Sequence, residues 1–182
     1  MLPRLATLPE IEAAVWQELV RATHDKHHAW RTPVLATIDG DAADARTVVL
    51  READADARQL VVYTDSRAHK VAQLRAHPGA TLALWSARLG WQLRCRVTCE
   101  VADDGLAVSS RWTRVKLSPA AQDYLSPLAP GAALDAQTPA LAHRECFAVV
   151  TATVARIDWL ELHREGHRRA LFGDGAARWL QP

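Results

Sequence analysis

Features that mark several specialised classes of protein are scarce in this 182-residue chain. It has three cysteines and no CxxC pair, which argues against a disulfide framework or a zinc knuckle and predicts free thiols in a reducing compartment. Nowhere do about 18 apolar residues follow one another, so no membrane span is predicted. The N-terminus lacks the apolar run of a signal peptide. A cytoplasmic location without membrane attachment is therefore the expectation.

The chain also has no large excess of either positive or negative charge. The 22 Lys and Arg residues are balanced by 21 Asp and Glu residues, for a net charge of +1. Such a balance gives no general attraction to nucleic acid, so any anion site has to be local. Hydrophobic residues make up 49% of the chain, enough for a core in one domain over residues 1–182.

The N-terminal part predicts a helix within residues 1–28. Apolar residues recur at steps of three and four over residues 9–23, and Thr7 with Glu10 forms a candidate capping box. The polar end of this helix contains three histidines, and two further histidines lie in HREGH at 163–167. Neither group comes with the further ligands that complete a metal site, so no metal is predicted.

Extended patterns dominate the rest of the chain. Short runs rich in Val, Leu and Thr at 32–38, 46–51 and 59–64 predict three antiparallel neighbours in a meander. The helical spacing of 66–77 follows, and residues 104–116 predict another helix. Residues 118–139 are rich in proline and predict a loop, a candidate lid on the substrate side. Further strands are predicted at 80–86, 91–103, 145–162, 167–172 and 177–182. Strands of this number and length favour a small closed barrel decorated by helices.

Cations gather where predicted strands and helices begin or end. Arg46 opens the 46–51 strand and Arg51 closes it, and their odd separation would point them to opposite faces. Ser66, Arg67 and Lys70 fall in the predicted first turn of the next helix. A helix N-terminus with added cations makes a phosphate cradle, although a solvated, charged helix start would have the same composition.

Five segments taken together resemble one family. They are RTVVLR at 46–51, YTDSRAHK at 63–70, HPGATLALWS at 77–86, WQLRCRV at 91–97 and DWLELHREGHRRALF at 158–172. Their order and spacing are similar to those of the pyridoxamine 5'-phosphate oxidase-like proteins. The resemblance implies a mainly β (α+β) fold, a split β-barrel of about six to eight mostly antiparallel strands. It also implies FMN as the cofactor, bound at the interface of a homodimer.

The same resemblance implies roles for individual residues. Arg46 and Lys70 would hold the FMN phosphate with help from Arg67 or Ser66, and Gln92 would reach the flavin from the opposite subunit. Backbone of the 46–51 strand would lie along the flavin, Tyr63 with Thr64 would touch ring and chain, and a late Trp and Arg would close over the cofactor. The implied cofactor contacts are Arg46, Val48, Val49, Leu50, Arg51, Tyr63, Thr64, Ser66, Arg67, Lys70, Gln92, Trp159 and Arg169.

The substrate half of the pattern departs from the family. Arg51 stands where the oxidases usually have Lys, and the late Arg-x-His is Glu165-x-His167 here, a reversal of charge. Arg51 and His167 remain the catalytic candidates. The family's phosphate-binding residues for the substrate have no clear match, and Arg111, Arg114, Lys116 and Ser118 are possible substitutes.

Three functions are compatible with these residues. The first is an FMN-dependent oxidoreductase acting on a small molecule, for which pyridoxamine 5'-phosphate is the family's default substrate. The second is a flavin carrier or sensor without oxidase activity. The third is a barrel that has lost FMN and serves as an interaction module, against which the retained Arg46, Lys70, Gln92, Trp159 and Arg169 argue.

Overall fold

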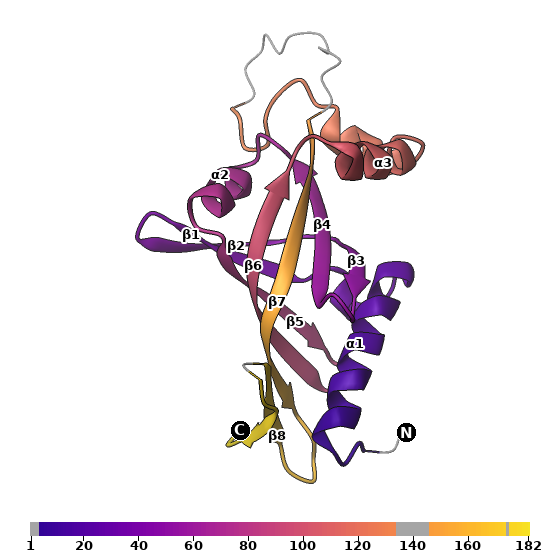
Figure 1. Ribbon diagram of the computed structural model, residues 1–182, viewed down its shortest axis with the longest axis vertical. Helices are drawn as coiled ribbons and strands as arrows, with labels where there is room; N and C mark the ends of the chain where they lie inside the picture. Colours follow the sequence, from indigo (N-terminus) through magenta and orange to yellow (C-terminus); the bar gives the residue numbers. More distant parts are fainter. Residues whose placement is uncertain (1–3, 134–145, 174) are drawn as a thin grey trace.

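The computed structural model describes residues 4–133, 146–173 and 175–182, and antiparallel strands make up most of them (Figure 1). The strands are β1 Val34–Asp39, β2 Ala42–Thr47, β3 Leu50–Asp54, β4 Gln59–Asp65, β5 Gly79–Ser86, β6 Trp91–Ala102, β7 Phe147–Glu161, β8 Arg168–Gly173 and β9 Arg178–Leu180. The helices are α1 Leu8–His24, α2 His69–Ala76 and α3 Leu106–Val115, with short 3-10 turns η1 Ala29–Arg31 and η2 Pro119–Tyr124.

One sheet connects all nine strands in the described part of the chain. Its main path is β2-β1-β5-β6-β7-β4-β3, with β8 added to β7 and β9 added to β8. The predicted α+β split-barrel class is confirmed, with nine strands instead of six to eight. The prediction of a closed barrel is wrong, because β2 and β3 end the path and do not pair with each other.

The predicted strand 46–51 is also wrong. Arg46 and Thr47 end β2, Val48 and Val49 form a crossing segment, and Leu50 begins β3. The backbone N–H of Val48 donates to the Pro33 carbonyl at 2.9 Å, and Leu50 is fully buried. β2 therefore pairs with β1 and β3 with β4, so the predicted meander is two separate hairpins. The run of β-branched residues predicted one continuous strand because Val48 in its middle is buried, although Val48 does not pair with a neighbouring strand.

Alternate residues of the central strands define two faces of the sheet. Leu93, Cys95, Val97 and Cys99 of β6 are buried on the inner face, as predicted, and α1 lies along that side (Figure 1). The capping box of Thr7 and Glu10 is present at the start of α1. The apolar stripe of α1 then packs into the main core, whose largest members include Trp30 and Trp159.

A second, smaller cluster covers one end of the outer face. Trp112 of α3 and Tyr124 of η2 pack against Phe147 and Val149 at the start of β7. The remainder of the outer face, over β5 to β9, carries mostly polar side chains. Residues 134–139 of the predicted proline-rich loop lie outside the described residues. No described helix has the length and apolar character needed to cross a membrane.

Glu161 connects the N-terminal segment and β8 to the end of β7. Its side chain is buried and accepts hydrogen bonds from Arg4 at 2.8 Å and from Arg168 at 2.8 and 3.1 Å. The Trp91 Nε1–H also donates to it at 3.4 Å. Burial alone would raise the pKa of Glu161, but the hydrogen bonds from both arginines outweigh it and the pKa is lowered.

Glu161→Gln is expected to lower the free energy of unfolding by about 2 kcal/mol near neutral pH, since two arginines lose their counter-charge. Because folding lowers the pKa of Glu161, its contribution is present above the unfolded pKa and lost as pH falls through the folded value. Urea unfolding across the acid range should show stability falling less steeply in the variant. Equal slopes would contradict this role, and Asp103→Asn, at an exposed ion pair with Arg75, is the control.

Candidate functional site

Arg46 is fixed between the first hairpin and α2. Its guanidinium donates to the Leu35 carbonyl at 3.4 Å and to Gln73 Oε1 at 2.9 Å. It also bonds Thr37 Oγ1 and Asp44 Oδ2. Gln73 lies on α2, so these contacts hold a strand end and a helix together around one cation.

Lys70 brings a second positive charge to the same place. It lies in the first turn of α2, and its Nζ donates to Thr64 Oγ1 at 3.0 Å. Among the described residues no carboxylate lies within ion-pair distance of this ammonium group. Burial lowers the pKa of Lys70, and the neighbouring charge of Arg46 lowers it further. The structure therefore brings Arg46 and Lys70 together, next to a helix start that has no side-chain cap.

Ser66 and Arg67 do not belong to the first turn of the helix as predicted, because α2 begins after Ala68. Arg67 instead forms a bidentate pair with Asp65, at 3.0 and 2.7 Å. Its remaining N–H groups donate to the carbonyls of residues 126–128, at 2.9 to 3.3 Å. The donors of Arg67 are thus committed to holding this loop, whereas no side-chain hydrogen bond forms for Ser66 within the described residues.

Tyr63 and Thr64 lie on opposite faces, since neighbouring residues of a strand alternate. Thr64 faces Lys70 on the inner side. Tyr63 lies under α3, with its ring 5.1 Å from that of Phe147 and its hydroxyl donating to Glu52 Oε1 at 2.6 Å. Burial, with this hydrogen bond, raises the pKa of Tyr63 to about 12. Tyr63 and Thr64, predicted to contact the cofactor together, therefore lie on opposite faces of the sheet.

A β-bulge between Leu50 and Glu52 decides where Arg51 points. The bulge adds a residue to β3, so that Arg51 and Glu52 both lie on the side of Tyr63. The Arg51 guanidinium is 5.8 Å from the centre of the Tyr63 ring, and its buried Nε has no hydrogen-bond partner in the described chain. The alternation expected for 46–51 did not foresee this placement.

Glu52 is not among the residues selected from the sequence, since it lies between the two predicted strands at 46–51 and 59–64. Its carboxylate receives two hydrogen bonds from Arg111, at 2.9 and 2.7 Å, and lies 3.8 Å from Arg114. The hydrogen bond from Arg111 is the main cause that lowers the pKa of Glu52. Two of the possible substitutes for substrate-binding residues are therefore engaged by an internal carboxylate.

A different group lies on the open outer face of the sheet. Gln92 of β6 pairs across the strands with Trp85 and Leu160, and Trp85 is 46% exposed. Nearby, Arg169 forms a bidentate pair with Asp158, at 2.9 and 2.7 Å. Asp158 also binds Arg94. Trp85 and Asp158 were not selected from the sequence, and only strand pairing shows them to be neighbours of Gln92 and Arg169.

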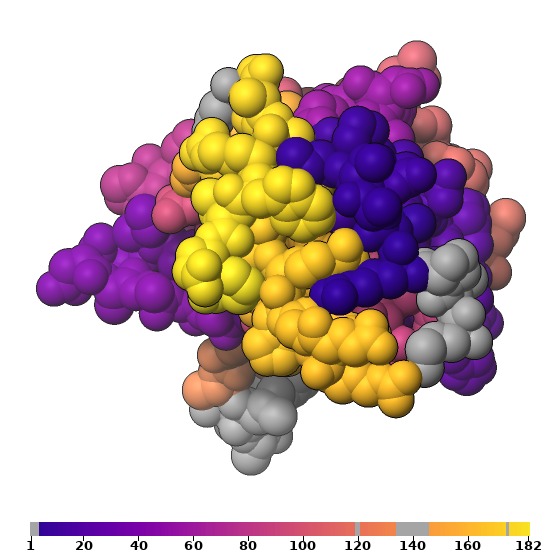
Figure 2. Space-filling view, turned by 90° about the horizontal axis from the view of Figure 1, so that it is seen from below, coloured from indigo at the N-terminus to yellow at the C-terminus, as the bar shows by residue number. Residues whose placement is uncertain are grey.

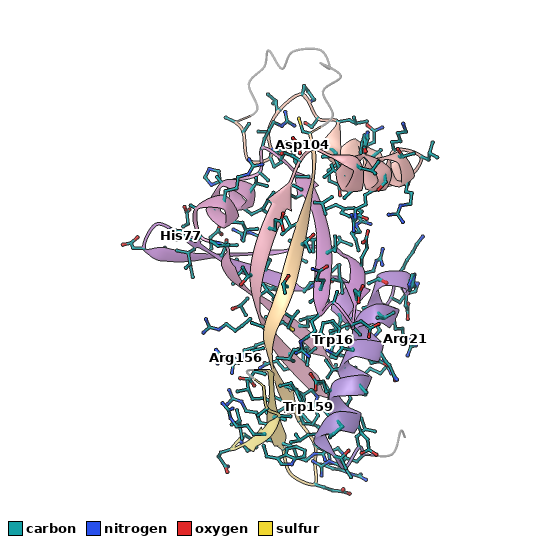
Figure 3. All side chains as sticks on the ribbon, viewed as in Figure 1. Trp16, Arg21, His77, Asp104, Arg156 and Trp159 are labelled. Atoms are coloured by element: carbon teal, nitrogen blue, oxygen red, sulfur yellow. The ribbon has the colours of Figure 1, made fainter. Side chains whose placement is uncertain are left out.

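Trp159 does not join Arg169. Trp159 is fully buried in the core and contacts Trp91 and Trp179, with ring centres 5.5 and 6.4 Å away (Figure 3). Its cross-strand partner is Ala170, whereas Arg169 pairs with Leu160 on the other face. The prediction that these two residues close together over a cofactor is wrong in this chain, because the β7–β8 register places them on opposite faces.

The HREGH segment forms the turn between β7 and β8 and not a helix. The backbone N–H of His163 donates to His167 Nδ1, and that of Glu165 donates to His163 Nδ1, both at 3.1 Å. Both imidazoles thus serve the turn. Over the described ranges, no three His, Cys, Asp or Glu side chains are placed to hold a metal ion.

The Arg46–Lys70 group and the Gln92–Arg169 group face opposite sides of the sheet. Arg46 pairs with Leu35, which pairs with Leu82, which in turn pairs with Cys95 on the inner face. Gln92 is an odd number of residues from Cys95 and lies on the outer face. Three strand spacings of about 4.8 Å and three residues of about 3.3 Å separate the two ladders by roughly 17 Å. One cofactor does not reach both groups within a single chain.

The fold is that of the split-barrel proteins of the α+β class, and comparison with known proteins identifies the family. The family model for the pyridoxamine 5'-phosphate oxidase FMN-binding domain matches residues 13–103, half of the chain. The chain belongs to this family. No curated protein matches it.

Solved structures show the same fold at low sequence identity. A pyridoxamine 5'-phosphate oxidase-related, FMN-binding protein from Nostoc punctiforme is 22% identical, with a TM-score of 0.75 and 98% of each chain covered. PhzG from Burkholderia lata, solved with tetrahydrophenazine-1-carboxylic acid, is 16% identical, with a TM-score of 0.75 and coverage of 100% and 98%. A heme-binding protein from Mycobacterium smegmatis is 16% identical with a TM-score of 0.52, covering 91% of this chain and 57% of that one.

Replacing Tyr63 by Phe should cost about 1 kcal/mol of stability, because Glu52 loses a hydrogen bond. Folding raises the pKa of Tyr63 from 10.0 to about 12, so its contribution is complete below the unfolded value and lost as pH rises through the folded one. Ultraviolet titration of the wild type and of Tyr63→Phe should therefore show that Tyr63 adds no tyrosinate signal at pH 10. Ionisation of Tyr63 at its ordinary pKa, found by comparison with Tyr63→Phe, would refute this placement.

Proposed function

We propose that this chain binds FMN and that Arg46 and Lys70 hold its phosphate. The observation that carries the proposal is the ammonium group of Lys70, which is half-buried, lacks an ion pair in the described residues and lies beside a second cation. Such a group has an unfavourable self-energy that a dianion would relieve. The first N–H groups of α2 add a favourable dipole end. The residues present therefore fit a phosphate monoester.

The flavin ring is assigned to the outer face of a second copy, so that two chains complete two equivalent sites in a homodimer. The support is geometric, since Gln92 and Arg169 face away from Arg46 within one chain. Exposed apolar side chains on the same face, Val34, Ile38 and Trp85, also favour a covering partner. Trp159 is left out of the proposed site because its side chain is fully buried.

Bound FMN would supply hydride and electron transfer, as flavins do. The chain's own residues would position it: Arg46 and Lys70 through the phosphate, Gln92 through hydrogen bonds to the ring edge. Arg169 would place positive charge near the reducible ring, moderated by its pair with Asp158. We propose an FMN-dependent oxidoreductase acting on a small molecule, in keeping with PhzG, a protein of the same fold that was solved with a small carboxylic acid.

Two features favour a substrate other than pyridoxamine 5'-phosphate, or the alternative of a flavin carrier without oxidase activity. Arg111 is bound by Glu52, and Glu165 lies in the turn between β7 and β8. The free thiols of Cys95, Cys99 and Cys146 fit a reducing compartment, and we assign the protein to the cytoplasm.

Purified protein is expected to be yellow, with FMN and not FAD released on denaturation. In the double variant Arg46→Ala with Lys70→Ala, affinity for FMN should fall by at least about 100-fold, since two charge-assisted contacts are lost. Arg75→Ala, on the same helix but paired with Asp103, is the matched control. Fluorescence titration and circular dichroism measure binding and folding. A folded double variant with undiminished affinity would show that the phosphate binds elsewhere.

The oxidoreductase assignment is tested by incubating the FMN-loaded protein with pyridoxamine 5'-phosphate and a panel of amines and reduced aromatic carboxylates. Peroxide formation coupled to substrate oxidation is the expected result for at least one compound. Turnover of none, with FMN bound, would favour the carrier or sensor alternative.

A further inference from the structure

Arginines form a continuous band on the outer face of the sheet. Strand register places them together, because cross-strand partners share a face. Arg96 pairs with Arg156, Arg94 pairs with Asp158, Asp158 pairs with Leu171, and Leu171 pairs with Arg178. The arginine band consists of Arg94, Arg96, Arg156, Arg169 and Arg178. Figure 3 shows Arg156 on the side of the sheet away from α1.

The band carries an excess of positive charge. Asp158 is the carboxylate within it, and that residue binds both Arg94 and Arg169. Arg96 and Arg178 are exposed and form no hydrogen bond or ion pair with the described residues. The next carboxylate along β6, Glu100, is four residues from Arg96.

The complementary charge lies on the β1–β2 hairpin. Asp39 and Asp41 are at its tip, both are exposed, and neither pairs with a cation in the described chain. The hairpin projects from the body of the molecule in two perpendicular views (Figure 1, Figure 2). Ile38, beside the tip, is 45% exposed. A projecting hairpin with an acidic tip and an apolar flank has the features of an arm that contacts another surface.

We propose that the occupant of the arginine band is the β1–β2 hairpin of a second copy of this chain. Asp39 and Asp41 of one chain would bind Arg96 and Arg178 of the other, and two-fold symmetry would form the same contact twice. Charge complementarity between the two exposed surfaces is the argument for this occupant over an unrelated partner. The contact specifies which faces of the two chains meet.

The spacing along the strands links this contact to the proposed cofactor site. Asp39 at the hairpin tip is four residues from Leu35, the cross-strand partner of Arg46. Arg96 is likewise four residues from Gln92, and four residues of strand span roughly 13 Å in each case. With the hairpin laid along β6 and its base toward Gln92, a tip bound at Arg96 would bring Arg46 of one chain level with Gln92 of its partner. This last step rests on the proposed function, whereas the hairpin contact does not.

Reciprocal charge reversal tests the contact. Asp39→Arg with Asp41→Arg in one variant, and Arg96→Asp with Arg178→Asp in another, should each raise the dissociation constant of the dimer at least about 10-fold. Mixing the two variants should restore dimerisation, because a mixed dimer regains opposite charges at both contacts. Sedimentation velocity at low and high salt measures this, with Lys26→Asp, an exposed change away from both surfaces, as the control.

The outcomes separate this inference from the proposed function. Wild-type protein that is monomeric, variants that dimerise as the wild type does, or folded variants that fail to rescue each other would overturn the hairpin contact. Binding of DNA or an acidic protein to the band without self-association would also overturn it. Absence of FMN from a dimer that passes the rescue test would overturn the cofactor assignment and leave the contact standing.

Discussion

Successive side chains of a strand point to opposite faces of the sheet, and this alternation governs where the charges of the molecule can act. The inner face is filled mainly with apolar side chains, and polar groups on it lie at an edge or end of the sheet. Arg46 and Lys70 occupy such an edge beside α2. Gln92 and Arg169, on the other face, are open to whatever covers the sheet. The proposals of cofactor and dimer both follow from that division.

Most arginines in the described residues bind carboxylates or carbonyls of the same chain, in keeping with its nearly balanced composition. Glu52, Glu161 and Asp158 each engage two arginines, and Asp65 engages Arg67. Most arginines are therefore structural, holding loops and helices to the sheet. Lys70, Arg96 and Arg178 are among the cations that form no ion pair with the described residues. Cations without counter-charges are where a protein of low net charge can bind an anion or a partner.

The family and the fold leave the reaction open. Structures with this fold include PhzG, solved with tetrahydrophenazine-1-carboxylic acid, and a protein described as heme-binding, at identities that establish only the architecture. Function in such a fold depends on individual side chains. In this chain Glu52 binds Arg111 next to α3, whereas the Lys70 ammonium next to α2 forms no ion pair with the described residues. The cofactor half of the site is therefore better supported by the geometry than the substrate half.

The sequence by itself determined the capped first helix and the alternation of β6, because these depend on local spacing and on periods of two or 3.6 residues. The resemblance of five segments to a known family indicated the family and the α+β class. It also identified Arg46, Lys70, Gln92 and Arg169 as residues of interest. Only the tertiary structure decided which of them meet. Three features decide which face of the sheet a side chain lies on: the split of 46–51 between two hairpins, the bulge at Arg51 and the β7–β8 register. A shift of one residue in a strand moves every side chain that follows to the opposite face.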